Sequence, residues 1–246
     1  IVDREEAIRS FKPEEYWTID GIFKHKKSSF PATLSHIGKK KVELSNKKDT
    51  DAIVDNIKKQ TYIIENIEDK VRQKNPLAPF MTSTLQQAAY NNLGFSVKKT
   101  MQIAQKLYEG VSLDDANNSV ALITYMRTDS LRLSDTATKN IRGYIAANFS
   151  KEYLPAKTEV YEKKSKGKAQ DAHEAIRPIN VDLTPDYVRR YLSPDEAKLY
   201  TLIWKRTVAC QMKAAQYAQR TVTIKGGEYI FKTTGSTLIF DGFLKV

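Results

Sequence analysis

Polar and apolar positions alternate through much of residues 16–72, and this alternation predicts a strand-rich first region. The expected strands are rich in β-branched and aromatic residues and span residues 16–23, 30–37 and 61–71. Between the last two strands we expect a short helix over residues 49–59, in which Ala52, Ile53 and Ile57 share one face.

The apolar spacing then changes to a helical period. Ser83 and Gln86 have the spacing of a capping box, and the helix that they open should stop near Gly94. Ser96 is expected to cap a second helix, which should end at Gly110. The apolar positions of this second helix are Val97, Met101, Ala104 and Tyr108.

Three more helices are predicted from their N-terminal signals. One should begin at Ser134, and Thr184 and Ser193 each stand before a proline, as an N-cap stands before the first helical residue. Glu196 completes a capping box with Ser193, and this last helix should run to about Met212. The expected apolar faces are Ala137, Ile141 and Ile145 in the first of these helices and Leu199, Ile203, Trp204 and Val208 in the last.

Strands resume over residues 217–224 and 228–235, with a turn at Gly226-Gly227. The order of strand-rich, helical and strand-rich regions predicts an α+β multidomain protein, with a helical domain inserted into an antiparallel β-rich arch domain. The expected parts are the first half of the arch at 1–75, the inserted helical domain at 76–214 and a second, truncated part of the arch at 215–246. A single mixed α+β domain is the alternative.

Charge changes this picture by suggesting a partner. The chain has 40 basic and 29 acidic residues, a net charge of +11, which favours a polyanionic partner. The excess is spread along the chain. Its densest island, Lys163, Lys164, Lys166 and Lys168, is as typical of a solvated loop as of a binding site. Charge alone therefore makes nucleic acid a plausible partner and no more.

Composition bounds the class of protein and its compartment. Hydrophobic residues make up 41% of the chain and charged residues 28%, which argues against wholesale disorder. No apolar run approaches the roughly 20 residues that cross a bilayer, and no signal peptide opens the chain. The single cysteine, Cys210, lies in an apolar helical setting, so we expect a core position and a reducing compartment. Because the chain starts at Ile1 inside a helical phrase and stops at Val246 inside an expected strand, we expect a piece of a longer protein.

The first candidate for chemistry is L-I-T-Y-M-R-T-D-S, Leu122 to Ser130. Tyrosine is a poor nucleophile at neutral pH because its pKa is about 10, but it suits attack on a phosphodiester when cationic donors stabilise the developing charge. Arg127 can bind phosphate oxygens in a bidentate manner, and residues two apart in extended backbone face the same side, so Tyr125 and Arg127 can reach one phosphate. Hydroxyls that can hydrogen-bond neighbouring phosphates belong to Thr124, Thr128 and Ser130. A purely structural tyrosine at a strand end is the alternative.

The second candidate is D-A-H-E-A-I-R-P, Asp171 to Pro178. His173 can donate a proton or a charge-assisted hydrogen bond to a phosphate near neutral pH. Arg177 lies four residues further on, so in a helical turn it would share a face with His173. A surface turn ending at Pro178 is the alternative. His25 and His36 lie in strand patterns without convergent partners and are expected to be structural.

Several motifs are missing from the sequence. It has no G-x-x-x-x-G-K-[ST] loop, no Cys/His cluster at zinc-ligand spacing and no D-x-D cluster suited to magnesium. We therefore predict no metal ligands in this chain.

Together these phrases resemble the type IA DNA topoisomerases, in their bacterial topoisomerase I branch. The resemblance rests on P-F-M-T-S-T-L-Q-Q-A-A (79–89), L-I-T-Y-M-R-T-D-S (122–130) and D-A-H-E-A-I-R-P (171–178), in the family's order, and extends to both ends of the chain. Met126 favours this branch, because topoisomerases of type III usually carry proline there. Ile179 replaces the usual threonine, which puts the contact of that one position in doubt.

The resemblance implies a reaction and roles for single residues. Tyr125 would attack a single-stranded DNA phosphodiester, forming a 5′-phosphotyrosyl link and releasing a 3′-hydroxyl, and religation would follow strand passage, relaxing negative supercoils without ATP. Arg127 would position the scissile phosphate and His173 would contact a nearby phosphate. Further expected DNA contacts are Thr124, Thr128, Ser130 and Arg177, with Ser83, Gln86 and Gln87 as helix-start residues that fit a capping role equally well.

The resemblance also implies what the rest of the enzyme would supply. Magnesium and its acidic ligands are expected in a domain outside this chain, and the helical insert should move as a unit on hinges near residues 72–80 and 213–220. We expect a monomer in the bacterial cytoplasm, associated with the nucleoid, with single-stranded and negatively supercoiled DNA as partners and no membrane. The isolated chain should be inactive. A non-catalytic nucleic-acid-binding module is the alternative function.

Overall fold

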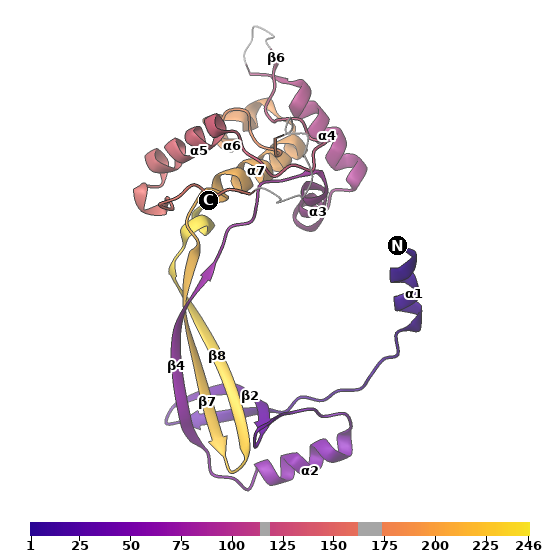
Figure 1. Ribbon diagram of the computed structural model, residues 1–246, viewed down its shortest axis with the longest axis vertical. Coiled ribbons are helices and arrows are strands. Elements are labelled where there is room, and N and C mark those ends of the chain that lie inside the picture. Colours follow the sequence, from indigo (N-terminus) through magenta and orange to yellow (C-terminus); the bar gives the residue numbers. More distant parts are fainter. Residues whose placement is uncertain (114–118, 162–173) are drawn as a thin grey trace. The chain divides into compact units, whose positions relative to one another are not determined.

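The computed structural model of the chain describes residues 1–113, 119–161 and 174–246, except for the side chain of His25. The predicted site residue His173 lies outside the described residues. The chain forms two compact units, one of Ile1–Arg72 with Tyr217–Thr237 and one of Gln73–Gln216 with Leu238–Val246. Figure 1 follows the elements along the sequence.

The first unit is built on an antiparallel sheet. In chain order its elements are α1 (Val2–Ser10), β1 (Asp20–His25), β2 (Ser28–Ile37), β3 (Lys40–Lys41), α2 (Lys47–Ile57) and the greater part of β4 (Ile63–Lys74), β7 (Ala215–Gly226) and β8 (Tyr229–Phe240), whose ends belong to the second unit. The strand order is β1-β2-β8-β7-β4, with β3 paired to β2, and β2 is antiparallel to β1, β3 and β8. Strands from the two ends of the sequence therefore hydrogen-bond in one sheet, and β4, β7 and β8 run side by side in Figure 1.

A small apolar core lies around β2 and β8. Phe231 is fully buried, and the rings of Phe23 and Tyr62 meet it edge to face at 5.2 and 5.7 Å between centroids. Asn46 caps α2 by accepting from the Asp49 N–H at 2.9 Å. The other buried apolar residues of this core are Ile19, Ala32, Leu34, Leu44, Ile224 and Tyr229. On α2 the inward positions are Ile53, Val54 and Ile57, so the expected place of Ala52 was wrong.

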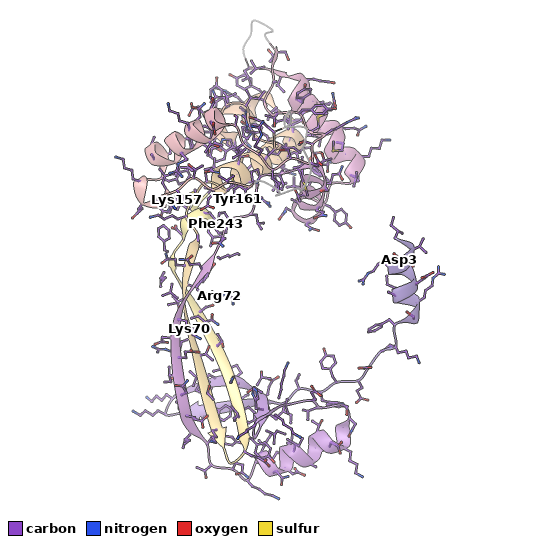
Figure 2. All side chains as sticks on the ribbon, in the orientation of Figure 1. Asp3, Lys70, Arg72, Lys157, Tyr161 and Phe243 are labelled. Carbon is purple, nitrogen blue, oxygen red and sulfur yellow. The ribbon has the colours of Figure 1, made fainter. Side chains whose placement is uncertain are left out.

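The long strand β4 is exposed along its whole length. Polar and charged side chains such as Lys70 and Arg72 extend from it (Figure 2). The guanidinium of Arg220 on β7 binds Asp69 of β4 through two hydrogen bonds of 2.7 and 2.8 Å, and Lys225 binds Glu65 at 2.9 Å. Cross-strand ion pairs thus accompany the backbone pairing of β4 and β7.

The second unit is mainly helical. Its elements are α3 (Thr82–Leu93), α4 (Val97–Glu109), β5 (Val111–Ser112), β6 (Ser119–Val120), α5 (Asp135–Asn148), η1 (Lys151–Tyr153), α6 (Pro185–Val188), η2 (Arg189–Tyr191), α7 (Pro194–Ala209) and η3 (Gly242–Lys245). The helix α7 packs against α3, α4, α5 and α6 and supplies the centre of the core (Figure 1). Its buried residues are Leu199, Tyr200, Ile203, Trp204, Thr207 and Val208.

Most helix starts follow the predicted caps. Ser96, Ser134, Thr184 and Ser193 each accept a hydrogen bond from the backbone N–H three residues on, and Glu196 returns the bond to the Ser193 N–H at 2.9 Å. Four of the predicted N-caps are therefore confirmed.

The predicted start of α3 was wrong. The helix begins at Thr82, and Thr84, not Gln86, accepts from the N–H of the N-cap residue Met81 at 3.1 Å. The Thr82 N–H donates to Thr128 O at 2.9 Å, so a partner distant in sequence fixes the first turn. Ser83 is therefore a helical residue and not the cap.

The predicted buried face of α4 was also wrong at both ends. The buried residues are Thr100, Ile103, Ala104 and Leu107. Val97 is 57% exposed and Tyr108 37% exposed, so the apolar stripe is rotated from its predicted position. The tyrosine at the end of this helix is consequently a surface residue.

The fold class is confirmed as α+β, with helices and an antiparallel sheet. The expected strand at the end of the chain is instead the 3-10 helix η3. The insertion of one domain into the other, the boundaries at 75/76 and 214/215, and the hinges stay predictions.

Candidate active site

Three segments distant in sequence meet in the helical unit through their backbones. Phe80 O accepts from the Ile176 N–H at 2.8 Å, and Ile123 forms an antiparallel bridge with Pro178. The Thr124 N–H donates to Arg177 O at 2.9 Å. Main-chain bonds therefore hold the segment around residue 125 between residues 80–82 and 174–179.

Exposure alternates along the tyrosine segment. Tyr125 is 41% exposed and Arg127 is exposed, whereas Met126 and Thr128 are only 1% and 8% exposed. The backbone bends at 126 and 127 and forms no strand there. Met126 and Thr128 nevertheless anchor the segment in the core while Tyr125 and Arg127 remain at the surface.

The Thr82 hydroxyl is a tie that sequence reasoning missed. As a donor it lies within reach of two carbonyl oxygens, Met126 O at 2.8 Å and Thr128 O at 3.0 Å. As an acceptor it binds the Thr128 N–H at 2.9 Å. These contacts fix the backbone on both sides of Arg127. The only available signal was a threonine next to the predicted helix start.

The hydroxyls that were candidates for phosphate contact make local bonds. Thr124 Oγ1 donates to Ala175 O at 2.7 Å and accepts from the Arg177 N–H at 3.0 Å. Thr128 Oγ1 accepts from the Ser130 N–H at 3.0 Å, and Ser130 Oγ accepts from the Arg132 N–H at 3.1 Å. All three side chains shape the backbone, and their contact with DNA stays a prediction.

Arg177 is held by an acidic partner. Its guanidinium pairs with Glu174 at 2.5 and 2.8 Å and donates to Pro178 O at 2.9 Å, and its side chain is 13% exposed. Ile176 and Pro178 form bridges, so the described residues 174–178 are extended, and the helical turn expected to align Arg177 with His173 was wrong. A DNA contact by Arg177 stays a prediction.

Glu174 is ionised through this pairing. Burial alone would raise its pKa, but hydrogen bonds from Ser134 and the charge and hydrogen bonds of Arg177 outweigh burial, and the pKa is lowered. The Ser134 N–H, at the start of α5, donates to Glu174 Oε1 at 3.0 Å. Glu174 therefore links the 174–179 segment to the N-terminus of a helix.

The helix α3 begins beside the tyrosine segment, because Thr82 is bonded to it. Along this helix Ser83 and Gln87 are exposed and Gln86 is half-buried. Their role in binding DNA stays a prediction.

A second tyrosine lies against the first. The rings of Tyr108 and Tyr125 are 5.3 Å apart at their centroids and inclined by 66°, an edge-to-face pair. Sequence reasoning counted Tyr108 only among the apolar positions of α4 and so missed it as a neighbour of the site.

Neither a metal site nor a membrane helix stands out in the part of the chain that the structure describes. There, no group of three or more His, Cys, Asp or Glu residues is placed to hold a metal ion. No helix among the described residues is long and apolar enough to cross a membrane.

Comparison with known proteins gives the class of the chain. The family described as "DNA topoisomerase" matches residues 1–246. The chain therefore belongs to the bacterial DNA topoisomerases of type IA, in the topoisomerase I branch, a family of DNA-binding isomerases.

Individual relatives are similar over the whole chain. DNA topoisomerase 1 of Campylobacter jejuni is 49% identical over 249 residues, which cover 100% of this chain and 35% of that protein. DNA topoisomerase 1 of Rickettsia felis is 45% identical over 252 residues, covering 100% and 32%. The structure of full-length topoisomerase I from Thermotoga maritima matches with a TM-score of 0.78 at 38% identity, over 99% of this chain and 38% of that one. The chain thus spans about a third of the length of the curated relatives that it matches.

Proposed function

We propose that this chain is the region of a type IA topoisomerase that carries the nucleophile Tyr125. The observation that carries the proposal is the alternation at the surface: Tyr125 and Arg127 are exposed, while Met126 between them is buried. A tyrosine and an arginine held two residues apart by an anchored backbone suit one phosphate. The full sequence match to the family supports the same assignment.

In the proposed reaction the Tyr125 phenol oxygen attacks the phosphorus of a single-stranded DNA phosphodiester. A bond forms between the phenol oxygen and phosphorus, and the bond from phosphorus to the 3′ oxygen breaks. The phenol proton is lost to solvent or base, and the leaving oxygen is protonated to a 3′-hydroxyl. The 5′-phosphotyrosyl link conserves the phosphodiester, so religation reverses the step after another strand has passed, and negative supercoils relax without ATP.

Arg127 would bind the non-bridging oxygens of the scissile phosphate and offset the charge that develops in the transition state. His173 would contact a nearby phosphate. The type IA family in general uses Mg²⁺, and by resemblance to that family its ligands would come from another part of the enzyme. The protein would act as a monomer on single-stranded and negatively supercoiled DNA, in the bacterial cytoplasm and at the nucleoid.

The organisation of the domains completes the proposal. The helical domain at 76–214, inserted between the two parts of a β-rich arch, would move with the cleaved strand on hinges near 72–80 and 213–220. Isolated, the chain would bind DNA weakly and in a salt-sensitive manner, with no cleavage or relaxation.

The test uses the full-length enzyme and single-stranded DNA labelled at its 3′ end, which stays with the 5′-phosphotyrosyl fragment. Tyr125→Phe removes the phenol oxygen and should abolish covalent trapping of the label, while Tyr187→Phe, at a similarly exposed tyrosine (42% against 41%), should leave trapping unchanged. Trapping that survives Tyr125→Phe would refute the nucleophile. A non-catalytic binding module would show DNA binding without any covalent product in either protein.

A further inference from the structure

The Tyr108–Tyr125 ring pair is a feature that the reaction above does not use. The centroid distance of 5.3 Å and the inclination of 66° fall in the range that aromatic pairs prefer. Tyr108 comes from the last turn of α4, and Tyr125 from the segment that follows the β5–β6 hairpin.

Backbone contacts near Tyr108 and near Tyr125 hold the two rings together. The Leu122 N–H donates to Leu107 O at 2.8 Å, next to Tyr108 in the chain and three residues before Tyr125. The hairpin adds the antiparallel pair of Val111 with Val120. Because the two backbones are tied so close to both tyrosines, the ring contact is part of the folded framework.

The pair is not a core contact. Leu107 is fully buried and supplies the packing of this turn, whereas Tyr108 and Tyr125 are 37% and 41% exposed. Within the described residues, neither phenol oxygen has a hydrogen bond. The ring of Tyr108 is therefore a contact that can restrict the direction of the Tyr125 ring.

We propose that Tyr108 is a positioning residue for Tyr125: its ring restricts the rotation of the Tyr125 ring and keeps the phenol oxygen directed away from the protein surface, toward the phosphate. This proposal rests on the proposed function, since it takes Tyr125 as the nucleophile. In this role Tyr108 would act through Tyr125, without contacting the DNA or the reacting atoms. Its contribution lies in holding the nucleophile in a productive rotamer before the DNA binds.

The expected effect follows from the strength of such pairs. Loss of an aromatic pair reduces the population of the held rotamer, and hence the cleavage rate, by roughly 2- to 12-fold. The experiment measures single-turnover cleavage of a 3′-labelled single-stranded oligonucleotide by the full-length enzyme at saturating DNA. The Kd for the same oligonucleotide is measured separately with Tyr125→Phe in each background.

Three variants separate the ring from the hydroxyl and from packing. Tyr108→Ala and Tyr108→Leu should lower the cleavage and religation rates by that factor and leave the Kd unchanged, whereas Tyr108→Phe, which keeps the ring, should retain the wild-type rates. Leucine keeps an apolar side chain. If Tyr108→Ala lowers the melting temperature, the cleavage and religation rates of Tyr108→Leu therefore test the positioning role. Tyr187→Ala is the matched control, because Tyr187 is 42% exposed and its ring lies 6.0 Å from that of Tyr191; it should change neither rate.

Each other outcome overturns the positioning role. Wild-type rates in Tyr108→Leu would show that the ring contact does not hold the nucleophile. A raised Kd with an unchanged rate at saturation would place Tyr108 in contact with DNA, and equal loss in Tyr108→Phe would assign the effect to the hydroxyl. Covalent trapping that survives Tyr125→Phe would instead remove the proposed function itself, a result distinct from all of these.

Discussion

Thr82→Val removes one hydroxyl and keeps the branched shape of the side chain, so it tests how the tyrosine segment is anchored. The hydroxyl accepts from the Thr128 N–H at 2.9 Å and donates toward Met126 O at 2.8 Å. Thr128 is 8% exposed, and its carbonyl keeps the bond from the Thr82 N–H. The loss therefore falls mainly on one buried N–H, and leaving such a group unsatisfied costs about 1–3 kcal/mol.

For a chain of this size that cost lowers the melting temperature by roughly 2–12 °C. Thermal unfolding of the 246-residue chain, followed by circular dichroism, measures it. Thr201→Val is the control, because the Thr201 hydroxyl bonds only within its own helix, to Ala197 O at 2.7 Å, and should change the melting temperature little. In the full-length enzyme Thr82→Val should also slow cleavage, since the backbone beside Arg127 loses its tie. Equal melting temperatures for the two valine variants would refute the reasoning.

Four further predictions concern stability and reactivity. Gly143→Ala, in the middle of α5 with no atom within 4 Å of an added Cβ, should stabilise the chain by about 0.5–1 kcal/mol in denaturant unfolding. Gly242→Ala should destabilise it, since φ is +50° and the Cβ would lie 2.5 Å from a backbone oxygen; a stable Gly242→Ala would contradict this. Because the folded pKa of Glu174 is lowered, its pairing with Arg177 stabilises the chain fully above the unfolded pKa near 4.5, and this stabilisation is lost as the pH falls through the folded value. Glu174→Gln should therefore lower the melting temperature at pH 7, and by progressively less as the pH falls below about 4.5. Cys210 is fully buried with its pKa raised to about 12, chiefly by burial, and should resist a thiol reagent at pH 8 until urea unfolds the chain.

The parts of the fold that depend on neighbouring residues were predictable from the sequence. Caps such as Ser134 and Ser193 bond to an N–H three residues away, so their signal lies within one turn. Where a distant segment takes part, the prediction failed. Thr82 starts α3 because Thr128, 46 residues later, accepts its N–H, and no local pattern carries that information.

In the candidate site, too, some features were predictable from the sequence and others were not. The sequence predicted that Tyr125 and Arg127 would face the same side, and both are exposed, although the backbone between them is bent and forms no strand. It did not predict that Glu174 would hold Arg177, since a helical turn was expected there, nor that Tyr108 would lie against Tyr125. The Tyr108–Tyr125 contact depends on how α4 packs against the segment after the hairpin. Glu174 and Arg177 are only three residues apart, but their pairing occurs in an extended segment that backbone bridges at Ile176 and Pro178 hold to distant residues.

The alternation of exposed and buried positions around residue 125 has a practical consequence for spectroscopy. Since Met126 and Thr128 hold the backbone, a small change on the Tyr125 ring leaves the core untouched. A fluorinated tyrosine introduced at this one position would thus carry a ¹⁹F nucleus at the surface without repacking the protein. In the proposed reaction its chemical shift would report the binding of DNA, the loss of the phenol proton and the formation of the bond to phosphorus.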